Sequence, residues 1–156
     1  MPENHPDPGR RRLLKSAAGV IALPLATMGT ARAALVDEVP ALRELVGTRA
    51  LQAGRVALDI PRLADNANAV ATRVTVDSPM TQADHVRAIH LIAERNPRPL
   101  VASFFMGPHT GKALIATRIR LAGDQRIIAV AEMSDGSLWS DVKEIHVTSS
   151  ACLDGT

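Results

Sequence analysis

Residues 126–147 read RIIAVAEMSDGSLWSDVKEIHV, and this stretch decides the fold. Residues 126–133 form a nearly continuous apolar run, which is typical of the central strand of a sheet. Ser134-Asp135-Gly136-Ser137 is a turn sequence, and Leu138–Val147 returns as a second strand. The stretch therefore predicts a β-hairpin at the centre of a β domain.

Five shorter strands are predicted upstream of this hairpin. In Val70–Val76, apolar residues or threonine occupy every second position, and Asp77-Ser78-Pro79 ends the pattern with a turn. Seven short strands joined by turns, without alternating helices, predict an all-β immunoglobulin-like β-sandwich of about seven strands. The other predicted strands are Val56–Ile60, Ala88–Ala93, Leu100–Phe105 and Ala113–Leu121.

Composition and charge argue against a nucleic-acid partner. The chain has three aromatic residues among 156, so single-stranded nucleic acid would find few rings on which to stack. Residues 1–33 hold five of the 18 Lys and Arg and two of the 16 Asp and Glu. The remainder has 13 basic against 14 acidic residues, a net charge of −1. No basic patch is therefore expected, and the core must consist mainly of aliphatic side chains.

The first 33 residues have the three parts of an export signal. Arg10-Arg11-Arg12-Leu13-Leu14-Lys15 matches the twin-arginine pattern R-R-x-[FL]-L-K, an apolar run follows over 16–28, and Ala31-Arg32-Ala33 is a small-x-small cleavage site. The apolar run is shorter than the roughly 20 residues that span a membrane. We therefore expect a twin-arginine signal peptide over 1–33, a periplasmic mature chain beginning near Ala34, and no membrane insertion after cleavage.

The mature chain is predicted to have three segments. Residues 34–48 form an N-terminal helical segment, because apolar residues recur at near-helical spacing over 35–47 and Gly47 ends the pattern. The immunoglobulin-like sandwich occupies 49–147. A flexible C-terminal arm of small and polar residues occupies 148–156.

Cys152 is the candidate functional residue. It is the only cysteine in the chain and lies on the predicted arm. Structural cysteines in the periplasm usually occur in pairs, so a single one indicates an intermolecular bond or a reactive thiol. The five residues from Val147 to Cys152 can span roughly 16 Å, at about 3.3 Å each. A thiol at that distance from the domain can enter a deep pocket of another protein.

Several segments carry a resemblance to a known family, in the same order along the chain. They are Val76–Thr81, Asp84–Val86, Ile89, Ala93–Pro97, Thr117–Ala122 and Ala129–Gly136, which include the sequences D-S-P-M-T and A-V-A-E-M-S-D-G. These segments resemble the SoxY family, the sulfur-carrier subunit of the periplasmic thiosulfate-oxidising Sox system. The resemblance covers essentially the whole mature chain.

The resemblance implies a fold, a site and a set of partners. SoxY proteins are immunoglobulin-like and form a heterodimer with SoxZ, so a SoxZ-like subunit is expected here. Their arm cysteine carries sulfur covalently, and this role would pass to Cys152, which keeps the family spacing after Val147-Thr148. A haem protein pair, a hydrolase and a dehydrogenase of the Sox type would act in turn on the attached sulfur. The chain itself would be a non-catalytic carrier.

The arm departs from the family's G-G-C-G-G ending. Ser150-Ala151 precede the cysteine here, and Leu153-Asp154 follow it. These residues are bulkier than glycine and lack its conformational freedom. Two alternatives therefore stay open: a diverged SoxY-like interaction module without standard sulfur-carrier activity, or a carrier for another periplasmic oxidoreductase.

No other residues form a convincing chemical site. The histidines lack the spacing of a metal site, and no nucleophile–base pair accompanies the acidic residues. We therefore expect no metal, no cofactor and no catalytic residue, and we assign the acidic residues to turns and partner contacts. The residues considered are His85, His90, His109, His146, Asp77, Asp84, Glu94, Glu132 and Asp135.

Overall fold

The computed structural model describes residues 27–148. Two helices, α1 (Thr27–Glu38) and α2 (Pro40–Val46), precede nine strands within this range. The strands are β1 (Leu51–Ala53), β2 (Val56–Asp59), β3 (Leu63–Ala64), β4 (Val70–Val76), β5 (Val86–Ala93), β6 (Leu100–Phe105), β7 (Leu114–Ile119), β8 (Gln125–Met133) and β9 (Leu138–Val147).

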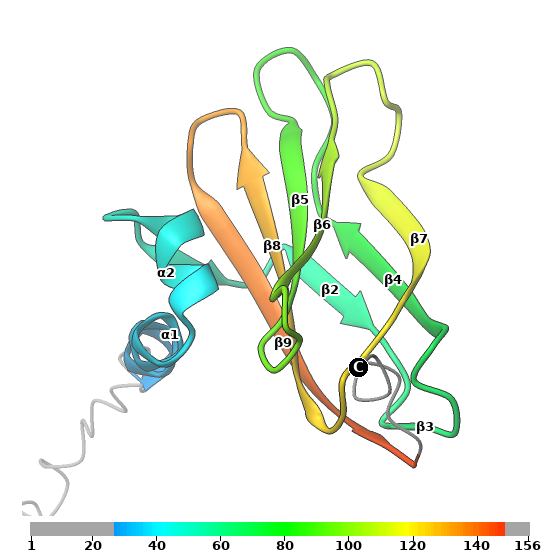
Figure 1. Cartoon of the computed structure of the whole chain (residues 1–156). Helices are drawn as coiled ribbons and strands as arrows, with labels where there is room; N and C mark the ends of the chain where they lie inside the picture. The colour runs from blue at the N-terminus through cyan, green and yellow to red at the C-terminus, as the bar shows by residue number, and fades with distance from the viewer. Residues whose placement is uncertain (1–26, 149–156) are drawn as a thin grey trace, which may run out of the picture.

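The strands form two sheets that pack face to face (Figure 1). The larger sheet has the order β1-β9-β8-β5-β6, and the smaller has the order β2-β4-β7. β8 lies between β9 and β5 and is antiparallel to both, as expected of the central strand. β1 and β3 pair in parallel with the two ends of β9. The immunoglobulin-like β-sandwich predicted from the sequence is confirmed.

The main core fills the space between the sheets. Alternate residues of β4 are buried, as the sequence pattern predicts, and they face Ile89, Leu91 and Ile127 of the larger sheet. Phe104 and Trp139 are only partly buried and pack at its margin. The core is therefore aliphatic, in agreement with the scarcity of aromatic residues.

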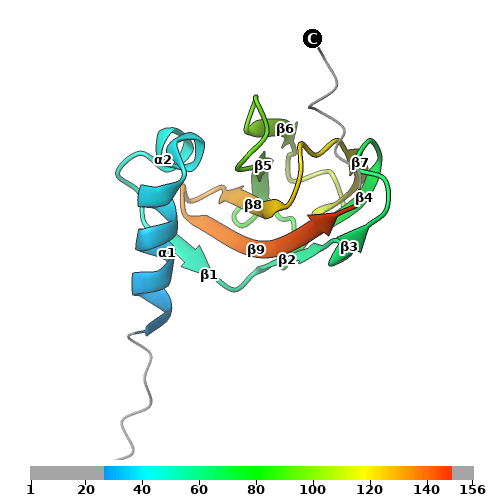
Figure 2. The ribbon, with the colours of Figure 1, turned by 60° about the horizontal axis from the view of Figure 1, so that its bottom comes forward.

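A second core covers the opposite face of the larger sheet. Leu35 and Val39 from the α1 segment and Leu42 and Val46 from α2 pack with apolar residues of β1, β5, β8 and β9. Figure 2 shows both helices beside β1 and β9. Ile128 of β8 belongs to this core, whereas its neighbour Ile127 belongs to the main core. Both faces of β8 are therefore buried, which explains its continuous apolar sequence.

The structure corrects two expectations about the elements. One helix over 35–47 was expected, but the segment holds the end of α1 and all of α2, separated by Val39. Pro40 causes the break, because proline has no N–H and is accommodated at the first position of a new helix. The structure also adds β1 and β3 to the seven predicted strands, and these have only three and two residues.

α1 extends across the predicted signal cleavage site. The Arg32 side chain, two residues before Ala34, donates a hydrogen bond of 3.0 Å to the Ser140 carbonyl. Leu35 and Val39, which contribute to the second core, lie after the site and would stay in a processed chain. No helix within residues 27–148 is long and apolar enough to cross a membrane. The signal peptide itself remains a prediction, because most of it lies outside the described residues.

Candidate functional site

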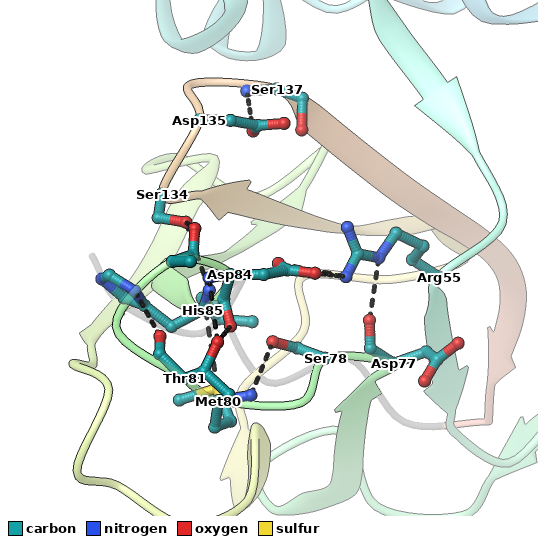
Figure 3. A network of polar contacts seen from close by, with 12 residues as sticks. Arg55, Asp77, Ser78, Met80, Thr81, Asp84, His85, Ser134, Asp135 and Ser137 are labelled. Carbon is teal, nitrogen blue, oxygen red and sulfur yellow. Dashed lines mark hydrogen bonds and ion pairs between the residues drawn. The ribbon is translucent and has the colours of Figure 1, made fainter.

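The segments that carry the family resemblance meet at one end of the sandwich, around Arg55 (Figure 3). Arg55 lies in the turn between β1 and β2 and has a positive φ of 26°. Its Nη2 atom lies 3.0 and 3.3 Å from the two carboxylate oxygens of Asp84, and its Nε donates to the Asp77 carbonyl at 2.8 Å. Its guanidinium also lies over the Trp139 ring, 5.8 Å from the centroid. One side chain thus joins four parts of the chain.

The loop between β4 and β5 is fixed to the β8–β9 turn by further hydrogen bonds (Figure 3). The Ser134 hydroxyl donates to the Ala83 carbonyl at 3.0 Å and accepts from the His85 N–H at 3.2 Å. The Ser134 N–H donates to the His85 carbonyl at 2.8 Å. Asp135 accepts from the Ser137 N–H at 2.9 Å, and its bonds to Ser137 hold the pKa of this carboxyl below its ordinary value. These bonds account for the D-S-P-M-T and M-S-D-G sequences as loop-fixing residues. We call Arg55, Asp77, Asp84, His85 and Ser134 the loop network.

Replacing Asp84 with alanine is expected to lower the free energy of unfolding by about 1 kcal/mol, because Arg55 would lose its carboxylate partner at a partly exposed site. Urea denaturation measures this change. Asp59→Ala is the matched control: Asp59 is exposed on β2 and no ion pair is recorded for it among residues 27–148, so its loss should cost less than about 0.5 kcal/mol. Equal losses for the two variants would contradict a structural role for the Arg55–Asp84 pair.

The end of β9 is anchored at the other end of the sandwich. The Asp124 carboxylate accepts from the Val147 N–H at 2.7 Å and lies 3.0 Å from Nδ1 of His146. Thr148 donates from its N–H to the Ala64 carbonyl and from its hydroxyl to the Asp65 carbonyl, both at 3.1 Å. The bonds from His146 and then from Val147 lower the pKa of Asp124, so its carboxylate is ionised at neutral pH. We call these contacts the arm anchor.

Cys152 itself lies outside the described residues, and the sandwich brings no other thiol to a site, since the chain has none. Four residues separate it from Thr148, so its Cα lies within about 14 Å of the arm anchor. The loop network is farther away, because the ten residues of β9 span roughly 30 Å between the two ends (Figure 1). The thiol is therefore confined to the neighbourhood of the arm anchor.

A third group of titratable residues lies on the outer face of β5 and β8. His90 is buried, and its Nδ1 lies 2.8 Å from the Ser103 hydroxyl. Burial lowers the pKa of His90; Glu132 opposes this shift, and Arg49 adds to it. Glu132 is itself paired with Arg49 at 3.4 Å and with Arg87 at 3.5 Å. These contacts are those of a satisfied structural histidine.

The other acidic residues that drew attention in the sequence also have local partners. Glu94 pairs with Arg126 at 2.7 Å, and Asp77 accepts from Arg55 only through its main-chain carbonyl. Within residues 27–148 no three His, Cys, Asp or Glu side chains lie close enough to hold a metal ion. The described part of the chain thus offers packing, loop fixation and an anchored strand end.

The comparison with protein families identifies this architecture. The model of the family described as "Sulfur oxidation protein SoxY" matches residues 42–152, which is more than two thirds of the chain. The chain belongs to the SoxY family. The SoxY match begins in α2, covers every strand and ends at Cys152.

Solved structures support the same assignment. The sulfur carrier protein SoxY from Chlorobium limicola f thiosulfatophilum is 25% identical, with a TM-score of 0.59 over 75% of this chain and 99% of that one. A superoxide reductase (neelaredoxin) from Ignicoccus hospitalis is 20% identical, with a TM-score of 0.54 over 60% of this chain and 80% of that one. A putative superoxide reductase from Thermotoga maritima is also 20% identical, with a TM-score of 0.53 over 63% and 87%. The last two share the fold alone. The comparison with curated protein sequences gave no match.

The SoxY sequence pattern located the cysteine but missed its surroundings. Asp124 was interpreted only as part of a turn after Gly123, although it holds both His146 and Val147. Arg55 gave no sequence signal, because its partners Asp77 and Asp84 lie 22 and 29 residues away. The positive φ of Arg55 follows Gly54, whose φ is 112°, and this glycine was the one local indication of an unusual turn.

Proposed function

We propose that this SoxY family member is a periplasmic sulfur carrier that holds sulfur intermediates covalently on Cys152. The observation that carries the proposal is the extent of the family match, which continues past the end of β9 and includes Cys152. The relative from Chlorobium limicola, which is named a sulfur carrier protein, lends further support. The sandwich would act as the handle, and the arm anchor would define where the arm begins.

The proposed cycle uses Cys152 as an attachment point and leaves catalysis to partner proteins. A haem protein pair would withdraw two electrons as the thiolate sulfur joins the sulfane sulfur of thiosulfate. Water would then cleave the terminal sulfonate as sulfate and leave a persulfide on Cys152. Oxidation of the persulfide sulfur by a dehydrogenase, followed by a second hydrolysis, would return the free thiol. A thiolate is the reactive form of cysteine, so each loading step needs the deprotonated sulfur.

The proposal also includes export and a partner subunit. Twin-arginine export would deliver the chain to the periplasm, where its single cysteine has no second thiol in the same chain with which to form a disulfide. A SoxZ-like subunit would accompany it. The haem, hydrolase and dehydrogenase partners would each receive the arm in a pocket.

Mass analysis of the protein from its native periplasm, in cells oxidising thiosulfate, tests this proposal. Lys143 is the last basic residue, so trypsin releases residues 144–156 as one C-terminal peptide that contains Cys152. We expect this peptide to carry added sulfur that a thiol reductant removes, and the mature chain to begin near Ala34. A fully unmodified thiol in cells that are oxidising thiosulfate would overturn the carrier role.

The residues around the cysteine favour a second candidate, a carrier or interaction module with different partners. Ser150, Ala151, Leu153 and Asp154 make this arm bulkier and more acidic than a glycine-flanked one. A pocket shaped for glycine would exclude them. This candidate predicts normal binding of a SoxZ-like subunit together with an unmodified Cys152 in the same mass experiment.

A further inference from the structure

Strand β6 is a free edge of the larger sheet. It pairs with β5 on one side, and no described strand pairs with the other side. Four large apolar side chains of the described residues are exposed, and two of them lie on this one strand: Leu100 is 48% and Phe105 81% exposed. Phe105 is also one of only three aromatic residues in the chain. An exposed aromatic side chain on an open sheet edge indicates an interaction surface.

Phe105 is held in place on the outer face of the sheet. Its ring meets the buried His90 ring edge to face, with the centroids 6.3 Å apart and the planes at 87°. His90 in turn bonds Ser103, the residue two before Phe105 on the same strand. An aromatic side chain that is exposed and already ordered loses little conformational entropy on being covered.

The hydrogen-bonding groups of the edge have a defined direction. The Met106 N–H donates to the Arg87 carbonyl at 2.9 Å, so the main chain of Met106 faces β5. The main-chain groups of successive residues in a strand point alternately to the two sides. Those of Ser103 and Phe105 therefore point away from β5, toward the open edge.

The edge lacks the usual protection against pairing. Natural edge strands commonly carry a charged residue, but residues 100–105 have the sequence LVASFF, with no charged side chain. Prolines at positions 99 and 108 bracket the strand, and proline has no N–H to donate. They limit pairing to a window of about five residues centred on Ser103.

We propose that β6 pairs with β6 of a second copy of this chain, antiparallel, about a two-fold axis through Ser103. Ser103 then faces Ser103 of the second copy, with its outward N–H and carbonyl groups satisfied. Phe105 faces Val101 of the second copy, and the two-fold repeats this contact on the other side. An identical edge meets each requirement of this one, since it is uncharged, of the same length and apolar where this edge is apolar.

Sedimentation equilibrium of the full chain with Cys152→Ser tests the pairing without interference from a disulfide. We expect a species of twice the 16.6 kDa chain mass. Phe105→Arg places two charges in the interface and should shift the mass to that of a single chain, with unchanged circular dichroism. Leu114→Arg is the matched control, because Leu114 is 44% exposed but lies on β7 of the other sheet, and this variant should stay dimeric.

A second variant fixes the register independently of folding losses. Ser103→Cys, in the Cys152→Ser background, should form a disulfide-linked dimer on mild oxidation, because the Cα atoms of such a pair are about 5.5 Å apart. Thr75→Cys, an exposed position on β4, should not. A single-chain mass for the Cys152→Ser protein, a dimer that survives Phe105→Arg, or equal disruption by Leu114→Arg would overturn the proposal. So would a heterodimer that occupies β6 in place of the second copy. None of these measurements depends on sulfur attachment.

Discussion

Replacing Cys152 with serine is expected to reduce covalent sulfur loading to background, the largest functional effect that any single substitution in this chain should have. Serine keeps the size and polarity of the side chain, but its hydroxyl cannot form the sulfur–sulfur bond that holds the cargo. No other thiol in the chain can substitute for it. Incubation with thiosulfate and the oxidising partners, followed by intact-mass analysis, measures the loss. The host strain should lose thiosulfate-dependent respiration in parallel.

Moving the thiol supplies the matched control. Ser149→Cys in the Cys152→Ser background keeps one cysteine but brings it three residues closer to the arm anchor, which shortens its reach by about 10 Å. Both variants should unfold at the urea concentration of the unchanged protein, since neither residue belongs to a core. Recovery of normal loading by the moved thiol would show that entry into a deep partner pocket is not required. Persistent loading without any cysteine would contradict the site altogether.

Truncating either Ile127 or Ile128 to alanine is expected to lower the free energy of unfolding by about 3 kcal/mol. The two residues are neighbours on β8 and face opposite sides of the sheet, and neither has any exposed surface. In a sheet with one solvated face, only one of two such neighbours would be costly to truncate. Here the helices cover the second face, so both substitutions leave a cavity.

Urea denaturation of the two variants gives the comparison directly. Thr75→Ala, at an exposed position of β4, should change the free energy of unfolding by less than about 0.5 kcal/mol. A large loss for Ile127→Ala with a small loss for Ile128→Ala would mean that α2 and the end of α1 do not seal the outer face in solution. The same pair measured on a chain processed near Ala34 would show how much the residues before the cleavage site contribute.

The predictability of each element follows from where its information lies. β4 and β6 were predicted to the residue, because alternation and flanking turn residues are local properties. β1 and β3 were missed because two or three residues carry no period, and their pairing with β9 is decided by tertiary packing. Pro40 divided a helical pattern whose apolar spacing continued across the break.

The site divides in the same way. Cys152 could be found from its uniqueness and from the family spacing, both of which are visible in the sequence. The loop network and the arm anchor could not, because Arg55–Asp84 and Asp124–His146 join segments that are 29 and 22 residues apart. The outward face of Phe105 was also hidden, since alternation places it on a face without saying what covers that face.

The pairing of β9 has a mechanical consequence. Neighbours flank it along its length: β8 on one side, and β1 near its beginning and β3 at its end on the other. An arm drawn into a partner's pocket and released again pulls along the axis of this strand. Ladder hydrogen bonds lie across that axis, so a pull along it loads many of them together in shear instead of opening them one at a time. The sandwich is thus built to bear repeated tension at the point where its cargo is handed over.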